Sequence, residues 1–176
     1  MYDSLLQNIK IAEHNSTILQ HLNLQPKDYI IATIHHAENT DDATKLAALF
    51  SAFEHCGEKE NVIIPAHPRT LKQLKKFSIK LKNAHLVDSL GYLDFIKLLN
   101  NAKRVVTDSG GVQKEAYFLK IPCITAYESS EWVETVQDGW NKVISPLKKD
   151  VMIDAIKNFE PKQKQKEHFG NGKASQ

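Results

Sequence analysis

Short apolar runs rich in β-branched residues alternate along the chain with segments whose apolar residues recur at helical spacing. The apolar runs predict buried strands, at residues 29–34, 61–64, 84–88, 105–107, 122–126 and 141–145. The periodic segments predict helices, at residues 4–22, 43–55, 71–77, 92–101, 112–119, 128–139 and 148–159. Strands that alternate with helices indicate repeated βαβ units. We therefore expect an α/β fold with a Rossmann-like parallel sheet and helices on both faces.

Capping and turn residues refine some of these boundaries. The first helical stripe is interrupted near Asn15-Ser16, and Thr40 or Asp41 can cap the helix that follows the first strand. Residues 66–70 predict a loop before the next helix. The polar, lysine-rich segment 161–176 predicts a tail with no packed element.

The loops that leave the carboxyl ends of the strands hold most of the unusual residues. They lie at residues 35–39, 66–70, 89–95, 108–111 and 127–131. In parallel sheets ligands bind beyond the carboxyl ends of the strands. We therefore expect these loops to converge on one edge of the sheet and to form the functional site.

One strand-to-helix connection contains adjacent small residues. Residues 105–107 lead into Ser109-Gly110-Gly111, and a helix follows. Free backbone N–H groups and the helix dipole favour an anion such as a phosphate at this point, and glycines allow close approach. Glu115 follows near the first turn, where its carboxylate can reach a hydroxyl of the molecule that carries the phosphate. A tight turn without a ligand is the alternative, because neither the Walker motif nor the dinucleotide fingerprint is present.

Three histidines follow predicted strands. His35 and His36 come directly after the first strand, and His67 with Arg69 after the second. Histidine can transfer a proton near neutral pH, and cationic groups beside a Gly-Gly helix start suit a diphosphate. Neighbouring side chains at a strand end point in opposite directions, so we expect only one of His35 and His36 to face a ligand. Solvated loop residues are the alternative. A metal held with Glu38 is disfavoured, because no pair has metal-motif spacing.

The fifth strand is followed by two serines and two acids. Ser129 or Ser130 can cap the next helix, but no capping box forms, because neither has Glu or Gln three residues later. Glu131 and Glu134 are therefore either solvated acids favoured by the helix dipole or hydrogen-bond acceptors for a ligand or a neighbour. Trp132 can stack on a base, although most such aromatics belong to a core.

Composition narrows the function classes. The chain has 176 residues, 41% of them hydrophobic, which suits a single domain over residues 1–176 with an N-terminal helical segment at 1–24. A net charge of +2 disfavours a dedicated nucleic-acid binder. No apolar run approaches the roughly 20 residues of a membrane span, and the first residues do not resemble a secretory signal. The spacing between Cys56 and Cys123 matches no metal-binding motif. We expect a cytoplasmic, reduced protein that binds neither nucleic acid nor a membrane.

Four motifs follow one another along the chain. They are Thr33-Ile34-His35-His36-Ala37-Glu38-Asn39, His67-Pro68-Arg69-Thr70, Thr107-Asp108-Ser109-Gly110-Gly111-Val112-Gln113-Lys114-Glu115-Ala116 and Glu131-Trp132-Val133-Glu134-Thr135-Val136-Gln137-Asp138-Gly139-Trp140-Asn141. Their order and approximate spacing resemble those of the non-hydrolysing UDP-N-acetylglucosamine 2-epimerases. The resemblance extends over nearly the whole chain.

The resemblance implies a UDP-sugar-binding domain like the C-terminal half of a glycosyltransferase-B fold. It also implies interconversion of UDP-N-acetylglucosamine and UDP-N-acetylmannosamine by elimination and re-addition of UDP, with no cofactor or metal. By similarity, His35 is the active-site histidine. The residues expected to bind UDP are His36, His67, Arg69, Phe95, Ser109, Gly110, Gly111 and Glu115. Glu38 and Glu131 are further candidates.

Some positions depart from the family pattern. His36 and Tyr127 stand where the family commonly has arginine, and Trp132-Val133 where it commonly has Arg-Pro. Trp-Val variants also resemble relatives that act on UDP-diacetamido-uronic acids, so the sequence leaves open which UDP-sugar is the substrate. The pattern is also compatible with a nucleotide-sugar-binding module or with a glycosyltransferase-B transferase domain.

Members of the family are about twice as long as this chain, which resembles their C-terminal half alone. The N-terminal half supplies catalytic carboxylates in the family. We therefore expect this domain to need that missing half as a partner, and to bind UDP weakly without epimerising by itself. An exposed interdomain face favours self-association, so a homodimer is a further expectation.

Overall fold

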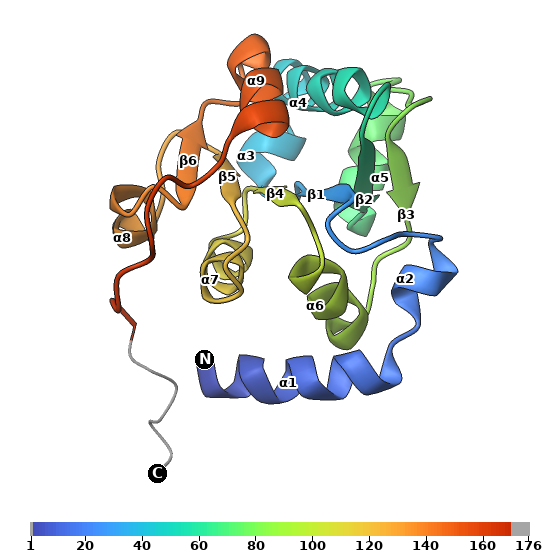
Figure 1. Ribbon diagram of the computed structural model, residues 1–176. Helices are drawn as coiled ribbons and strands as arrows, with labels where there is room; N and C mark the ends of the chain where they lie inside the picture. The colour runs from blue at the N-terminus through green and yellow to red at the C-terminus, as the bar shows by residue number, and fades with distance from the viewer. Residues whose placement is uncertain (1, 170–176) are drawn as a thin grey trace.

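A six-stranded parallel sheet forms the centre of the computed structural model, which describes residues 2–169 (Figure 1). The strands are β1 (Tyr29–Thr33), β2 (Asn61–Pro65), β3 (His85–Val87), β4 (Arg104–Thr107), β5 (Cys123–Ala126) and β6 (Asn141–Ile144). Their order is β3-β2-β1-β4-β5-β6, and each neighbouring pair is parallel. This is the doubly wound Rossmann order, in which the winding reverses between β1 and β4. The predicted fold class is confirmed.

Helices cover both faces of the sheet (Figure 1). On one face lie α1 (Tyr2–Asn15), α2 (Ile18–His21), α6 (Tyr92–Asn100) and α7 (Gly110–Phe118). On the other lie α4 (Ala43–Gly57), α5 (Pro68–Lys76) and α9 (Lys149–Asn158). The short helices α3 (Ala37–Thr40) and α8 (Val133–Gln137) lie in loops after β1 and β5. Within residues 2–169, no helix combines the length and apolar character needed to cross a membrane.

Alternate residues of β1 enter the two hydrophobic cores. Ile30 and Ala32 pack with the α4 and α9 side, and Tyr29 and Ile31 pack with the α1 and α6 side. All four are fully buried. A strand buried on both faces must be apolar throughout, which is why its sequence shows a continuous apolar run rather than alternation.

One helix cap and one helix start differ from the prediction. Asp42 caps α4, in place of Thr40 or Asp41, and its carboxylate accepts hydrogen bonds from the N–H groups of Thr44 and Lys45. The predicted loop over residues 66–70 is only partly a loop, because α5 begins at Pro68. Proline suits a first helical position, since its missing N–H would have no partner within the helix.

The segment after α9 packs against the domain through side-chain and backbone contacts, although it forms no element of secondary structure in the described part. The described part, residues 161–169, has no helix or strand. Asp138 is buried, and its carboxylate accepts hydrogen bonds from the Tyr117 hydroxyl and the Lys166 N–H, at 2.5 and 2.8 Å. Burial opposes ionisation of Asp138, but these bonds and the nearby His168 ring hold its pKa down to about 2. The predicted tail residues 170–176 lie outside the described residues.

We predict that Gly57→Ala destabilises the fold. A Cβ at Gly57 would lie 2.7 Å from the backbone carbon of Asn83 and 2.8 Å from the nitrogen of Ala84. The Glu54 carboxylate ties this backbone to α4, because it accepts hydrogen bonds from the N–H groups of Asn83 and Ala84. We expect a loss of about 1–3 kcal/mol in the free energy of unfolding, measured by urea denaturation.

Gly111→Ala is the matched control for that substitution. A Cβ there would have its nearest neighbour at 3.8 Å, so we expect a change within about 0.5 kcal/mol. Equal losses in the two variants would contradict the close-packing explanation.

Candidate functional site

The carboxyl ends of β1 and β4 meet at the point where the strand order reverses. Thr33 and Thr107 are register partners, and their hydroxyl oxygens lie 2.7 Å apart. In open parallel sheets, ligands bind beyond the carboxyl ends of the strands at the point where the strand order reverses. The topology therefore brings the His35-His36 loop and the Ser109-Gly110-Gly111 turn together, as predicted from the sequence.

A buried carboxylate joins these two loops. Asp108 is 3% exposed, and its oxygens accept hydrogen bonds from the backbone N–H groups of His35 and His36, at 3.1 and 3.0 Å. The Asn39 amide donates to the same carboxylate at 3.0 Å and to the Ala126 carbonyl at 3.0 Å. Buried charge is tolerated when hydrogen bonds satisfy it in this way. The sequence-based site omitted Asp108 and Asn39, although an acid directly after a buried strand is a usable signal.

The three predicted histidines lie together. The His35 ring centroid lies 5.5 Å from that of His36 and 6.1 Å from that of His67. The expectation that His35 and His36 point in opposite directions is wrong, because β1 ends at Thr33 and strand alternation no longer applies. Burial lowers the pKa of His35, and the neighbouring His36 and His67 add to this, whereas the Asp108 carboxylate, 3.8 Å from the ring, opposes it. The neutral imidazole is therefore favoured near pH 7.

The turn after β4 forms a capped helix start. Ser109 is the N-cap of α7, and its hydroxyl accepts a hydrogen bond from the Val112 N–H at 3.4 Å. The Ser109 N–H donates to the Thr107 hydroxyl at 3.0 Å. Gly110 and Gly111 are the first two helical residues. Their N–H groups have no carbonyl partner within the helix, which is the arrangement that binds anions.

Glu115 lies further along α7 and contacts α6. The Tyr92 hydroxyl donates a hydrogen bond to its carboxylate at 3.0 Å. Burial raises the pKa of Glu115, although that hydrogen bond counteracts the effect. Burial and the Glu115 charge raise the pKa of Tyr92 to about 12. Phe95, also on α6, is half-buried against the α1 side of the core.

Two predicted charged residues already have protein partners. The Arg69 guanidinium donates to the Asp41 carboxylate at 2.5 Å and to the Thr40 hydroxyl at 3.1 Å. The Glu38 carboxylate accepts a hydrogen bond from the Tyr127 hydroxyl. The role of Arg69 as a cation for a diphosphate stays a prediction, since its charge is balanced by Asp41 here.

The loop after β5 is attached to α7. The Ser130 hydroxyl donates to the Gln113 side chain at 2.7 Å, and the Trp132 indole N–H donates to the Gly110 carbonyl at 2.7 Å. Trp132, rather than Ser129 or Ser130, is the N-cap of α8, and no side chain bonds as its cap. Glu131 lies between the two attached residues, beside Gly110.

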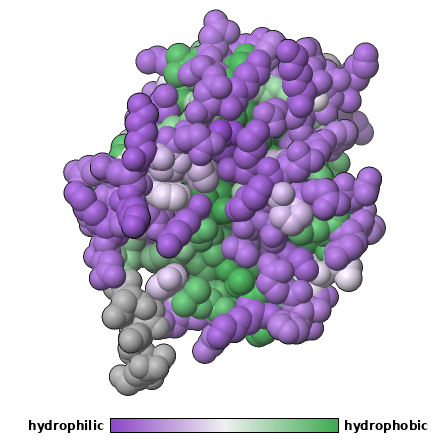
Figure 2. Space-filling view, in the orientation of Figure 1, coloured by the Kyte–Doolittle hydropathy of each residue, from purple (hydrophilic) through white to green (hydrophobic). Residues whose placement is uncertain are grey.

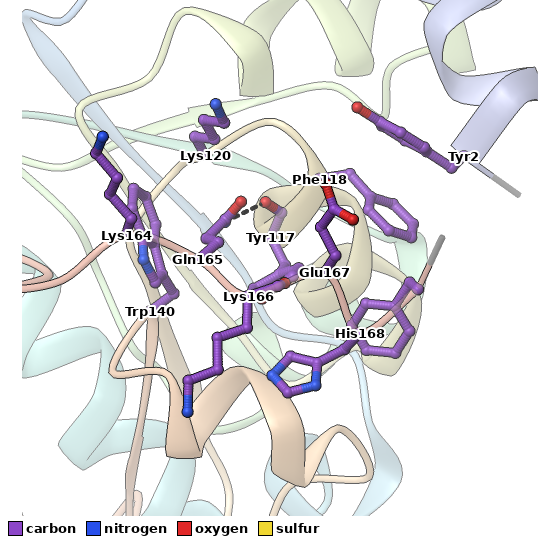
Figure 3. Close-up of a pocket in the computed structure, with 11 residues that line it drawn as sticks. Tyr2, Tyr117, Phe118, Lys120, Trp140, Lys164, Gln165, Lys166, Glu167 and His168 are labelled. Atoms are coloured by element: carbon purple, nitrogen blue, oxygen red, sulfur yellow. Dashed lines mark hydrogen bonds between the residues drawn. The ribbon is translucent and has the colours of Figure 1, made fainter. Parts of the chain in front are cut away.

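A separate hollow of about 500 Å³ lies near the other end of α7. Tyr2, Tyr117 and Phe118 line it together with residues 164–169 of the tail (Figure 3). The Tyr2 and Phe118 rings stack at 4.7 Å. In the orientation of Figure 1, Figure 2 shows apolar surface in the centre and lower part of this face of the molecule, with smaller apolar areas near its top and right edge. The nine residues of α7 span about 13 Å, but the hollow extends toward the helix start, because the Phe169 ring lies 5.9 Å from the ring of Trp132, which bonds the Gly110 carbonyl. Within the part of the chain that the structure describes, no group of three His, Cys, Asp or Glu residues could hold a metal ion.

Comparison with known proteins identifies the family. The model of the UDP-N-acetylglucosamine 2-epimerase family matches residues 1–176. The chain belongs to this family. It is 47% identical over 182 residues to a UDP-N-acetylglucosamine 2-epimerase homolog of Methanococcus maripaludis, covering 99% of this chain and 50% of that protein. The chain spans about half the length of the curated relatives it matches.

Solved structures of epimerases share the fold. The UDP-GlcNAc 2-epimerase of Methanocaldococcus jannaschii, in complex with UDP-GlcNAc and UDP, has a TM-score of 0.87 and 38% identity, over 98% of this chain and 49% of that one. An Escherichia coli heptosyltransferase has a TM-score of 0.52 at 16% identity, over 76% of this chain and 41% of that one, which shows a likeness of fold alone. The predicted resemblance to half of a glycosyltransferase-B fold is confirmed.

We predict that the His35 ring titrates below the ordinary histidine pKa of about 6.5. Asp108→Asn should lower the midpoint further, because it removes the charge that opposes the effect of burial. The folded pKa lies below the unfolded one, so stability is lost as the pH falls from about 6.5 through the folded value. NMR titration of the ring measures the midpoint, and His35→Gln identifies its resonance. A midpoint above 6.5 would contradict the prediction.

Proposed function

We propose that this chain is the UDP-sugar-binding half of a UDP-N-acetylglucosamine 2-epimerase. The observation that carries the proposal is a capped Gly-Gly helix start at the β1–β4 switch point, in a chain 38% identical to an epimerase solved with UDP-GlcNAc and UDP. Such a helix start favours the diphosphate that both of those ligands contain.

In this proposal different residues of the site bind different parts of the nucleotide. Ser109, Gly110 and Gly111 hold the diphosphate through backbone N–H groups. Glu115 accepts a hydrogen bond from a ribose hydroxyl, because its carboxylate lies on the helix that begins at the diphosphate. Phe95, on the adjacent α6, lies by the uracil.

The histidines face the sugar end in this arrangement. Elimination removes the C2 proton and breaks the C1–O bond to UDP, which leaves a double bond between C1 and C2. Return of a proton to the opposite face of C2, with re-formation of the C1–O bond to UDP, inverts C2. His35, kept neutral by its surroundings, is suited to take up or return a proton. In this proposal His36, His67 and Arg69 supply cationic groups to the leaving diphosphate, and Glu38 is a further candidate. No cofactor or metal is required by these steps.

A uronic-acid substrate is the second candidate. The chain is 37% identical over 150 residues to the UDP-2,3-diacetamido-2,3-dideoxy-D-glucuronate 2-epimerase of Pseudomonas aeruginosa, covering 84% of this chain and 42% of that protein. Both sugars carry the same UDP group, so the α7 site serves either one. Competition between the two UDP-sugars for binding distinguishes these candidates.

We predict that the chain binds UDP and that two substitutions weaken binding. Ser109→Tyr should reduce affinity at least tenfold, because the ring fills the start of α7. Glu115→Ala should reduce it about 5- to 20-fold, because a charged acceptor is lost. Isothermal titration with UDP measures both effects.

Ser4→Tyr and Glu58→Ala are the matched controls, since both residues are exposed and lie outside the strand-end loops. Unchanged affinity in both site variants would place the UDP site elsewhere on the domain.

We predict that the chain by itself does not interconvert UDP-N-acetylglucosamine and UDP-N-acetylmannosamine. In a two-domain arrangement, the opposite wall of the cleft would supply the remaining acid and base groups. NMR of the sugar protons follows conversion directly, and a full-length epimerase serves as the positive control. Turnover by the 176-residue chain would contradict the prediction that a second domain supplies the remaining acid and base groups.

A further inference from the structure

Glu131 is held between two residues that are both attached to α7. On one side, the Ser130 hydroxyl donates to Gln113 at 2.7 Å. On the other, Trp132 donates through its indole N–H to the Gly110 carbonyl at 2.7 Å and through its backbone N–H to the Ser130 hydroxyl at 3.0 Å. The backbone of Glu131 is therefore fixed relative to the start of this helix.

A buried polar network supports this attachment. Gln113 and Asn141 are each 3% exposed, and the Asn141 amide donates to the Gln113 oxygen at 3.3 Å and to the Thr135 hydroxyl at 3.1 Å. The Thr125 hydroxyl donates to the Asn141 oxygen at 2.7 Å. Because buried hydrogen-bonding groups must keep their partners, this network defines where the loop lies on α7.

The Glu131 carboxylate lies directly against the first residue of α7. A Cβ built on Gly110 would be 2.7 Å from the Glu131 Oε2 atom and 3.5 Å from the Trp132 indole nitrogen. The carboxylate therefore occupies the space that a side chain at position 110 would need. Within residues 2–169, the hydrogen bonds and ion pairs of the structure include none made by the Glu131 side chain, and the residue is exposed.

Other acidic groups face the same region. The Tyr127 hydroxyl is bonded to Glu38, and the charges of Asp108 and Glu131 also act on it. The nearby ammonium of Lys114 lies 4.2 Å from the centroid of the Trp132 ring, in a cation–π contact. The start of α7 combines N–H groups that attract an anion with an adjacent carboxylate that repels one.

We propose that Glu131 is a specificity-determining residue that weakens the binding of charged ligands such as UDP at the start of α7. This inference rests on the proposed UDP site. The carboxylate benefits from the helix N-terminus when the site is free, and a diphosphate that arrives there must displace it or lie beside a like charge. This electrostatic repulsion depends on the charge of the ligand. Uridine has no phosphate, so its binding should not be weakened by Glu131.

The test compares Glu131→Gln with wild type by titration of UDP and of uridine. Loss of one nearby surface charge should tighten UDP binding about 3- to 10-fold and leave uridine affinity unchanged. The gain should shrink at high salt, because exposed charges are screened. Glu131→Ala should show the same direction, and the exposed position makes both variants compatible with folding.

Glu128→Gln is the matched control, because it removes the same charge from the same loop at a residue that contacts Ser145 rather than α7. UDP affinity of this variant should stay within about twofold of wild type. Unchanged or weaker UDP binding by Glu131→Gln, in a protein whose wild type binds UDP, would overturn the inference alone. Absence of UDP binding by the wild type would overturn the proposed function, and this inference with it.

Discussion

The buried Asp108 carboxylate is the interaction on which the site depends. It lies directly after β4 and accepts hydrogen bonds from two backbone N–H groups of the β1 loop and from the Asn39 side chain. An ionised group at 3% exposure is costly unless its partners are present, so the two loops are constrained to stay together. The pairing of β1 with β4 brings the loops close, and Asp108 then fixes their relative position.

This constraint organises two chemically different regions on one edge of the sheet. On the β1 side lie His35, His36 and His67, where the His35 ring neighbours the other two. On the β4 side lies the start of α7, with its free N–H groups and the adjoining Glu131. A nucleotide-sugar that extends from one region to the other would place its diphosphate at the helix start and its sugar near the histidines. The proposed division of roles is consistent with this arrangement.

Several features of the site were predictable because they depend on local sequence. The strand, the small-residue turn and the helix around Ser109 follow from apolar periodicity and capping preference, which act over a few residues. The cap of α4 and the start of α5 were misplaced by a few residues, since adjacent polar residues compete for the cap and only the backbone conformation selects one. The directions of His35 and His36 were wrong for a related reason: strand alternation ends where β1 ends, at Thr33.

The sequence by itself determined the α/β class, the strand-end loops, the small-residue turn before α7 and the motifs that mark the family. Only the tertiary structure decided which charges are available there. It pairs Arg69 with Asp41, places the Glu131 carboxylate against Gly110, and packs the tail onto Asp138. Each of these contacts joins residues that are far apart in the sequence and belong to different elements or loops. Such contacts depend on strand order and on how helices pack on the sheet, and local patterns of apolar and polar residues do not encode them.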